Sequence, residues 1–267
     1  MPGAGSPGSM AADPQAKFVY IYNFGAIDRF AIDATTGSLT AVPGSSFPGY
    51  FGIITISPNG RFLFATDTGT IWAFTVDPLT GTLMLVAGSP FPVPVGDPIS
   101  PSFSSSLVVE PSSSFVYTVG GMLQHGGGDL LTFVFGFSID AATGALNGIS
   151  DPSYFYPGNN LSLYAIAVSG SFVYASNDQG VIAFSIAPGT GVLTQVNGSP
   201  YPPGTASGGI VISPDGKCLF QAVNTYGMLD TGNIIDAFTL DPSTGAASSS
   251  DSVTTPTGPF ILNIATR

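Results

Sequence analysis

One strand-turn-strand pattern recurs five times along the chain, and it constrains the fold more than any other feature. Each copy carries a central phenylalanine, and these five phenylalanines are 44, 63, 47 and 54 residues apart. Periods of this length are typical of the four-stranded blades of a β-propeller rather than of helical solenoid repeats. The five copies are Ile27 to Leu39, Ile71 to Leu83, Val134 to Leu146, Val181 to Leu193 and Ile235 to Ala247.

The segments around each copy predict the remaining strands of a blade. An apolar run that ends in a turn of the Ser-Pro-Asp-Gly type, as in Ile210 to Gly216, predicts an innermost strand A. A run of alternating aromatic and small residues, as in Phe172 to Ser176, predicts strand B. The phenylalanine lies in strand C. An Asp-x-x-Thr-Gly turn, in which the aspartate caps amides and the glycine takes a positive φ, then leads into strand D.

The two ends of the chain predict a closed ring. Asp13 to Tyr20 match an A–B turn with its strand B, whereas Phe260 to Ala265 match a strand A. Pairing of this C-terminal strand with the N-terminal blade closes the ring and removes its free sheet edges. We therefore predict an all-β, five-bladed β-propeller of four-stranded antiparallel blades. Residues 12–267 form this single domain, and residues 1–11 are a disordered lead or a remnant of cloning.

Composition restricts the partners of the protein. Charged residues make up 8% of the chain, with five Lys and Arg against 16 Asp and Glu and a net charge of −11. This charge argues against nucleic acid and anionic membranes, because both require basic residues. No segment is apolar enough for membrane insertion. The Ser/Thr/Gly-rich, Lys-poor composition predicts an extracellular or periplasmic protein, although no signal peptide is visible. Cys218, the single cysteine, is expected to be a buried, inert thiol.

The turn and strand motifs together resemble a known family. The pattern I-x-x-F-x-I/V-D-x-x-T-G-x-L, followed by G-S-P-F/Y and I-S-P-D-G-K/R, resembles the lactonase-type propellers, the 6-phosphogluconolactonase-like family, over residues 12–267. Members of this family usually have seven blades, so five blades is a departure. The matching residues are core and turn positions. The resemblance therefore implies a fold and leaves the activity open, because non-enzymatic binding proteins share this blade.

Few residues suit an enzyme that acts on a phosphorylated lactone. Lys17, Arg61 and Lys217 each follow an A–B turn, which places them on the face opposite the B–C and D–A loops. Phosphogluconolactonase activity is therefore not expected. His125, the only histidine, lies in a glycine-rich B–C segment and is the best single candidate for a general base. Asp129 and Asp230 are the candidates to assist it.

Metal binding has weak support in the sequence. One His and one Cys exclude the usual transition-metal sites. Calcium would suit a ring of loop carboxylates such as Asp97, Asp129 and Asp230, but the alternative is that these are solvated loop residues, because no D-x-D-x-D spacing is present. We therefore expect no cofactor, with calcium the only ion worth testing. Glu110, the only glutamate, is expected to be a solvated turn residue.

Aromatic residues in or beside the loops, Tyr50 and Phe51 among them, either fill gaps between blades or form a binding surface for a small molecule, a glycan or a protein. Our leading hypothesis is a non-catalytic ligand- or protein-binding scaffold that uses the B–C and D–A loop face. The alternative is a lactonase-like hydrolase of an uncharged lactone or ester. An ordered His125 within hydrogen-bond reach of an acid distinguishes the second from the first. The proposed ligand-binding residues are Tyr154, Phe155, Tyr156, Tyr226, Met228 and Phe91.

Overall fold

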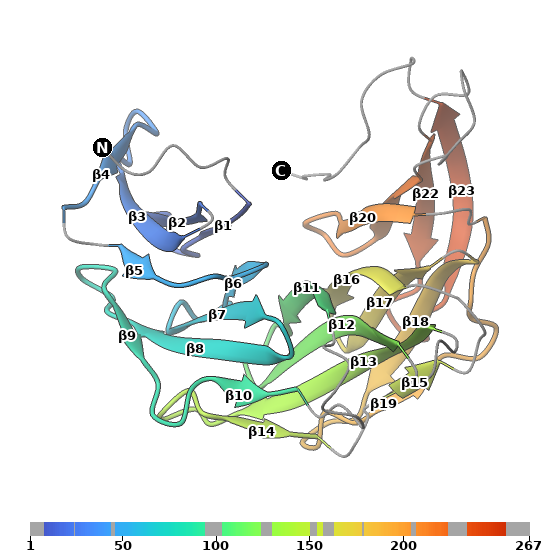
Figure 1. Cartoon of the computed structure of the whole chain (residues 1–267). Helices are drawn as coiled ribbons and strands as arrows, with labels where there is room; N and C mark the ends of the chain where they lie inside the picture. Colours follow the sequence, from blue (N-terminus) through green and yellow to red (C-terminus); the bar gives the residue numbers. More distant parts are fainter. Residues whose placement is uncertain are drawn as a thin grey trace.

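The chain folds into five antiparallel β-sheets that follow one another in sequence (Figure 1). The computed structural model describes residues 8–23, 25–43, 46–93, 103–123, 130–149, 154–156, 163–177, 179–203, 207–223 and 234–254. These residues contain strands and turns but no helix, and so no helix that could cross a membrane. The predicted all-β class is confirmed.

The first three sheets have five strands each. Sheet 1 comprises β1 (Ser9–Ala12), β2 (Phe18–Tyr22), β3 (Ala26–Ile32), β4 (Leu39–Ala41) and β5 (Phe47–Pro48). Sheet 2 comprises β6 (Ile54–Ile56), β7 (Phe62–Asp67), β8 (Thr70–Val76), β9 (Leu83–Leu85) and β10 (Phe91–Pro92). Sheet 3 comprises β11 (Phe103–Val109), β12 (Phe115–Leu123), β13 (Leu130–Ile139), β14 (Leu146–Gly148) and β15 (Tyr154–Tyr156).

The last two sheets have four strands each. Sheet 4 comprises β16 (Leu163–Ser169), β17 (Phe172–Asn177), β18 (Gly180–Ile186) and β19 (Leu193–Gln195). Sheet 5 comprises β20 (Ser207–Ile212), β21 (Cys218–Val223), β22 (Ile234–Leu240) and β23 (Ala247–Thr254). In sheets 2 to 5 the predicted strands A to D are hydrogen-bonded in chain order, and in sheet 1 β1 stands before the predicted strands B to D.

The extra strands of sheets 1 to 3 correct the prediction of four strands in every blade. β5, β10 and β15 belong to the segments that leave strand D, and each pairs with strand C of its own sheet. Strand C is long enough to pair with two short strands, one after the other, along the same edge. In sheet 3, Phe137 to Ile139 pair with β14, whereas Thr132 to Val134 pair with β15.

The turn between strands C and D forms as its residue types predict. In the first copy, Asp33 Oδ1 accepts hydrogen bonds from the amides of Thr35 (2.9 Å) and Thr36 (2.8 Å). Gly37 closes the turn at φ +74°, a left-handed conformation that glycine adopts without steric cost. The turns at Asp77, Asp140 and Asp241 repeat these contacts, and Ala187 replaces the aspartate in sheet 4.

The hydrophobic core lies between consecutive sheets. Four clusters of buried side chains join sheets 1 and 2, 2 and 3, 3 and 4, and 4 and 5. The phenylalanine of strand C contributes to each cluster, as Phe74 does to the first. Full burial of a side chain of this size stabilises a fold by about 1.5–3 kcal/mol. Packing between consecutive sheets therefore buries the apolar side chains of these clusters.

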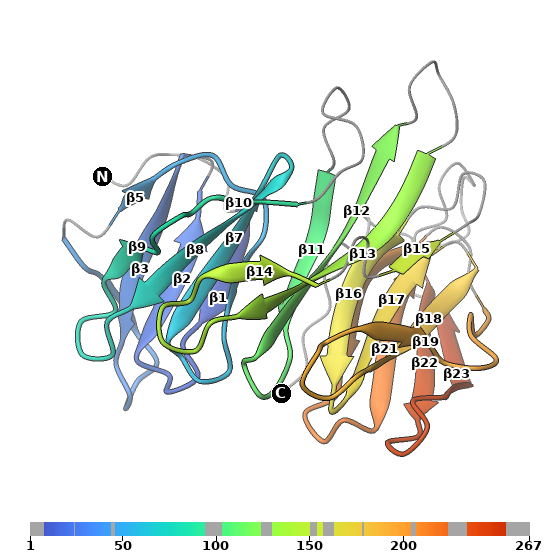
Figure 2. The same cartoon turned by 90° about the horizontal axis from the view of Figure 1, so that it is seen from below.

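The five sheets are arranged as an arc, with sheet 1 and sheet 5 at its two ends (Figure 1). Contacts join β1 to β6, β11 to β6 and β7, β16 to β11 and β12, and β20 to β16 and β17, so each sheet packs against the next, as Figure 2 also shows. β1 pairs with β2 and occupies the innermost position of sheet 1. We predicted the C-terminal strand at this position, and part of β1 falls within the predicted disordered lead. That closure is not confirmed, and residues 255–267 lie outside the described ranges.

Candidate functional site

Most of the residues that the sequence suggested as a site lie outside the described ranges. These residues are His125, Asp129, Asp230, Tyr226, Met228 and Asp97. Their proposed roles in catalysis, ligand binding or calcium binding therefore stay predictions. Described residues nevertheless line a hollow on each of the two faces of the molecule.

The aromatic candidates that are described belong to strands. Tyr154 to Tyr156, expected in a loop, form β15 and pair with Thr132 to Val134. Phe91 lies in β10, is half-buried and packs against the hydrophobic cluster between sheets 2 and 3. Its ring also lies over Gly88, since a Cβ added there would be 3.5 Å from Phe91 Cε1. Phe91 is thus held by the core next to the D–A connection.

The basic residues lie where the sequence predicted them. Lys17 Nζ donates to Pro78 O (3.4 Å), and Arg61 Nη1 donates to Ala141 O (2.7 Å), so each reaches the C–D turn of the following sheet. Arg29 is buried within strand C and donates through Nη1 to Thr82 Oγ1 (2.8 Å). The side chains of Lys17, Arg29 and Arg61 therefore form contacts between neighbouring sheets.

Glu110 is buried, which corrects the expectation of a solvated turn residue. Its Oε1 accepts hydrogen bonds from Ser112 Oγ (2.6 Å), Ser114 N (2.6 Å) and Phe115 N (3.1 Å), and its Oε2 accepts one from Ser112 N (2.7 Å). The carboxylate thus organises the A–B turn of sheet 3. It also lines a hollow of about 370 Å³ on the A–B face, between sheets 3 and 4.

A second hollow of about 300 Å³ lies on the predicted functional face, at the boundary of sheets 1 and 2. We call it the Tyr50 depression. It combines the end of strand B of sheet 1, the D–A connection before β6, and the B–C turn after β7. Its lining residues are Tyr22, Tyr50, Phe51, Gly52, Thr66, Asp67 and Thr68.

Aromatic side chains build the floor and rim of the Tyr50 depression. The Phe51 ring is buried and makes edge contacts with Tyr22 (5.7 Å between centroids), Trp72 (5.8 Å) and Phe74 (6.2 Å). Edge-to-face geometry of this kind stabilises aromatic clusters beyond their area burial. Tyr50, by contrast, is 79% exposed and stands at the rim. The depression therefore has a rigid apolar floor beside an accessible aromatic ring.

The polar side of the depression is formed by Thr66 to Thr68. Thr66 is buried and its hydroxyl accepts a hydrogen bond from Ile53 N (2.9 Å), which locks the D–A connection to strand B. Asp67 is half-buried, and its Oδ1 accepts a bond from Thr68 N (2.6 Å). Within the described residues no hydrogen bond reaches Asp67 Oδ2, so this oxygen is available to a ligand.

This combination suits a neutral, ring-shaped, hydroxylated ligand. Aromatic rings pack against the apolar face of a sugar ring, whereas a carboxylate accepts hydrogen bonds from hydroxyl groups. A carboxylate without a basic neighbour repels a phosphate. In the described part of the chain, no group of three or more His, Cys, Asp or Glu residues could hold a metal ion. The sequence had singled out Tyr50 and Phe51 as loop aromatics, but it gave no signal for Asp67, whose turn is short and unremarkable.

Comparison with known proteins supports the fold. No protein-family model matches the chain, and no curated protein matches it in sequence. Among solved structures, a presumed 6-phosphogluconolactonase of Bacteroides uniformis is similar over 97% of this chain and 75% of its own, with a TM-score of 0.71 and 20% identity. The periplasmic gluconolactonase of Pseudomonas aeruginosa is similar over 94% and 86%, with a TM-score of 0.50 and 16% identity.

A third similar structure is that of a β-propeller domain. The β-propeller domain of Cps50 (Swd1) from Myceliophteria thermophila is similar over 94% of this chain and 74% of its own, with a TM-score of 0.55 and 11% identity. At these identities the similarity establishes the fold alone. The chain therefore has a β-propeller fold, and its resemblance to lactonase-type propellers is confirmed at that level.

Proposed function

We propose that this protein is a lactonase-like propeller that binds and hydrolyses an uncharged sugar lactone in the Tyr50 depression. The observation that carries the proposal is the half-buried Asp67 carboxylate beside a cluster of aromatic rings. The fold similarity to a presumed 6-phosphogluconolactonase and to a gluconolactonase supports the lactone class. It favours the hydrolase hypothesis over the purely non-catalytic scaffold. We further propose that each sheet is one blade, so that the chain supplies five blades.

The hydrolysis we propose needs a general base, a hydrogen-bond donor to the carbonyl oxygen and a surface that holds the sugar ring. Asp67 Oδ2 takes a proton from a water molecule, whose oxygen adds to the lactone carbonyl carbon. The Thr68 hydroxyl donates to the carbonyl oxygen as negative charge develops there. The ring C–O bond then breaks, and the ring oxygen recovers the proton from Asp67. Tyr50 packs against the sugar ring and holds it in place.

A phosphorylated substrate fits this site poorly. The described cations are engaged between sheets or on the A–B face, and none lines the depression. We therefore propose a neutral lactone such as glucono-δ-lactone rather than 6-phosphogluconolactone. The predicted base His125, with Asp129 or Asp230, is expected from the sequence on the same face and is the competing catalytic group.

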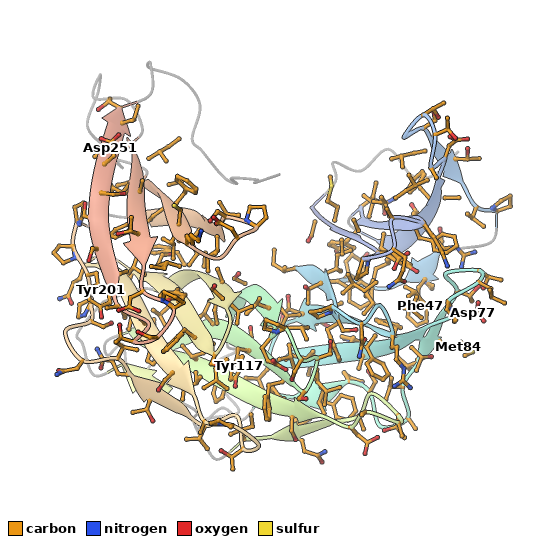
Figure 3. All side chains as sticks on the ribbon, turned by 180° about the vertical axis from the view of Figure 1, so that it is seen from behind. Phe47, Asp77, Met84, Tyr117, Tyr201 and Asp251 are labelled. Carbon is orange, nitrogen blue, oxygen red and sulfur yellow. The ribbon has the colours of Figure 1, made fainter. Side chains whose placement is uncertain are left out.

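The test is hydrolysis of glucono-δ-lactone in a pH-stat, corrected for the spontaneous rate. Asp67→Asn should lower kcat by about 10²–10⁴-fold, the usual contribution of a general base. Tyr50→Ala should raise KM and leave kcat nearly unchanged, because uniform binding is lost. Asp77→Asn is the matched control, since Asp77 lies in the C–D turn of sheet 2 (Figure 3) and does not line the depression.

Two outcomes would contradict the proposal. Full activity in Asp67→Asn with loss of activity in His125→Ala would place the chemistry on the B–C insertion of sheet 3. Equal rates with 6-phosphogluconolactone would mean that a phosphate is accepted.

A binding function without hydrolysis is the second candidate, and the exposed Tyr50 ring favours it. In that case glucono-δ-lactone, gluconate or an oligosaccharide would raise the melting temperature without turnover, because a ligand selective for the native state stabilises it. A protein partner is the further alternative. Calcium binding at Asp97, Asp129 and Asp230 is tested by the same melting assay with calcium and with a chelator.

The acidic, Lys-poor composition and the periplasmic relative support an extracellular or periplasmic location.

A further inference from the structure

Basic residues at the start of strand B hold two of the boundaries between sheets. Lys17 Nζ donates to Pro78 O (3.4 Å), and Arg61 Nη1 donates to Ala141 O (2.7 Å). The Arg61 guanidinium also lies over the ring of Phe62, 5.2 Å from its centroid. At the boundary of sheets 2 and 3, a turn carbonyl and an aromatic face thus hold a cation of the chain.

The boundary between sheets 1 and 2 adds a buried carboxylate to this arrangement. Asp13 lies in the A–B turn, where its Oδ1 accepts a hydrogen bond from Gln15 N (3.3 Å) and its Oδ2 accepts one from Lys17 N (3.2 Å). The Arg29 guanidinium lies over the ring of Phe18, 6.0 Å from its centroid. One carboxylate, one aromatic ring and two cations therefore meet at this boundary.

The boundary between sheets 3 and 4 repeats the acceptors of this arrangement without its cations. The corresponding residues of the two boundaries are Asp13 and Glu110, Phe18 and Phe115, Pro78 and Pro188, Lys17 and Ser114, and Arg29 and Gly136. The first three pairs keep a carboxylate, an aromatic ring and a turn carbonyl. In the last two pairs, a serine and a glycine replace the two cations.

The hollow on the A–B face lies where the cations are missing, and we call it the Glu110 hollow. It has a volume of about 370 Å³, and Glu110, Ser114, Phe115 and Pro188 are among its lining residues. None of the described residues that line it is basic. Glu110 and Phe115 are buried, whereas Ser114 is exposed, so the hollow opens to solvent beside a carboxylate and a ring. Its volume is within the range of about 300–1,000 Å³ that is typical of ligand pockets.

Neutral donors surround the buried charge of Glu110. They are the amides of Ser112, Ser114 and Phe115 and the hydroxyl of Ser112. Such donors satisfy carboxylate oxygens but leave the net charge in place, and a buried charge is best balanced by an opposite charge. Oε2 accepts a single bond among the described residues, from Ser112 N, so it can accept another.

We infer that the Glu110 hollow binds a guanidinium group, the side chain of arginine, which a ligand supplies in place of the cations that the chain itself has between sheets 1 and 2. The guanidinium packs against the Phe115 ring, as Arg61 packs over Phe62, and donates to Glu110 Oε2 and to the Pro188 carbonyl. A guanidinium suits this site better than an ammonium, because its planar fork of donors fits both a ring face and a carboxylate. The site lies on the face opposite the Tyr50 depression, and it does not depend on the hydrolysis proposed there.

Isothermal titration calorimetry with N-acetyl-argininamide tests this inference. We expect one saturable site per chain, and no binding of N-acetyl-citrullinamide, which has nearly the same shape but no charge. Ser114→Arg should abolish binding, because the guanidinium of the variant fills the hollow as Arg61 does at its own boundary. Glu110→Gln should weaken binding at least about tenfold, because the charge pair is lost.

Asp67→Asn is the matched control, since it removes the carboxylate of the other hollow and should leave the affinity for N-acetyl-argininamide unchanged. Loss of binding in Asp67→Asn, with full binding in Ser114→Arg, would place the probe in the Tyr50 depression and overturn the inference. Absence of saturable binding, or equal binding of the citrulline compound, would also overturn it. Glu110 organises its own turn, so circular dichroism checks the fold of Glu110→Gln, and Ser114→Arg decides the question if that variant does not fold.

Free L-arginine, titrated beside the blocked amide, distinguishes the two sources of a guanidinium. Tighter binding of the amide indicates an arginine of a peptide or protein. Tighter binding of the free amino acid indicates arginine itself. Either result supports a guanidinium site in the Glu110 hollow.

Discussion

The hydroxyl of Tyr20 donates a 2.7 Å hydrogen bond to the carbonyl oxygen of Gly81, and this bond joins strand B of sheet 1 to the C–D turn of sheet 2. Tyr117, labelled in Figure 3, repeats the arrangement with Gly191 at 2.7 Å, between sheets 3 and 4. Burial raises the pKa of both phenols above the ordinary value. Each hydroxyl therefore stays protonated and acts as a donor at any physiological pH.

Tyr117→Phe should destabilise the fold by about 1–3 kcal/mol, because the Gly191 carbonyl loses its side-chain donor in a buried site. Urea unfolding gives the free energy. Tyr50→Phe is the control, since Tyr50 is 79% exposed and its loss of a hydroxyl should change stability by less than about 0.5 kcal/mol. Equal effects of the two substitutions would show that the bond between sheets contributes nothing.

Substitution of two turn glycines by alanine distinguishes the free-energy cost of backbone strain from that of steric overlap. Gly37→Ala places a side chain at φ +74° in open space, and it should cost about 1–2 kcal/mol from the left-handed conformation alone. Gly144→Ala adds a Cβ 2.6 Å from Phe62 at φ +81°, so overpacking should add about 1–3 kcal/mol. Thermal unfolding of both variants measures the difference. A Gly144→Ala variant no less stable than Gly37→Ala would contradict tight packing of the Phe62 ring against Gly144.

The strand C phenylalanines should differ in their contributions according to their place in the arc. Phe74→Ala removes a fully buried ring and should cost about 3–5 kcal/mol. Phe30→Ala removes a half-buried ring and should cost about 1–2 kcal/mol. The comparison is made by denaturant unfolding of the 267-residue chain. If both cost the same, the Phe30 ring is as well covered in solution as that of Phe74.

Asp236 should make stability depend on pH. It is 3% exposed, its Oδ1 has no hydrogen-bond partner among the described residues, and burial raises the pKa of its carboxyl, partly offset by a bond with Ser252. Gln221, its partner across β21 and β22, is also buried, and within the same described ranges its amide has no hydrogen-bond partner. The folded state thus favours the protonated acid, so stability falls as pH rises from about 4, the value in an unfolded chain, through the folded pKa.

Asp236→Asn removes this dependence. The variant should match the unsubstituted protein below about pH 4 and exceed its stability at pH 7. Urea unfolding at both pH values measures the effect. Asp251→Asn is the control on the exposed outer strand of the same sheet (Figure 3) and should show no such gain. A variant less stable at pH 7 would mean that the ionised carboxylate has a partner.

Local features of the structure follow from the sequence because they depend on neighbours in the chain. The Asp-x-x-Thr-Gly turns form where predicted, since Asp33 reaches its own turn amides and Gly37 tolerates a positive φ. Strands B to D appear in the predicted order in every sheet, and Lys17 and Arg61 lie on the predicted face. The candidate site was only partly predictable: Tyr50 and Phe51 carried a signal as loop aromatics, whereas Asp67 carried none.

The tertiary structure alone decided which residues are covered. Phe30 and Phe74 occupy the same position of the same motif, yet one is half-buried and the other is inaccessible. Glu110 resembles a solvated turn residue in sequence, but it is buried and accepts hydrogen bonds from its own turn. β1 fills a position that the periodicity assigned to the other end of the chain. The motif and its period determine the strands and turns of one sheet. The burial of a side chain depends instead on the neighbouring sheet, which packs about 10 Å away, and only the tertiary structure determines which sheet that is.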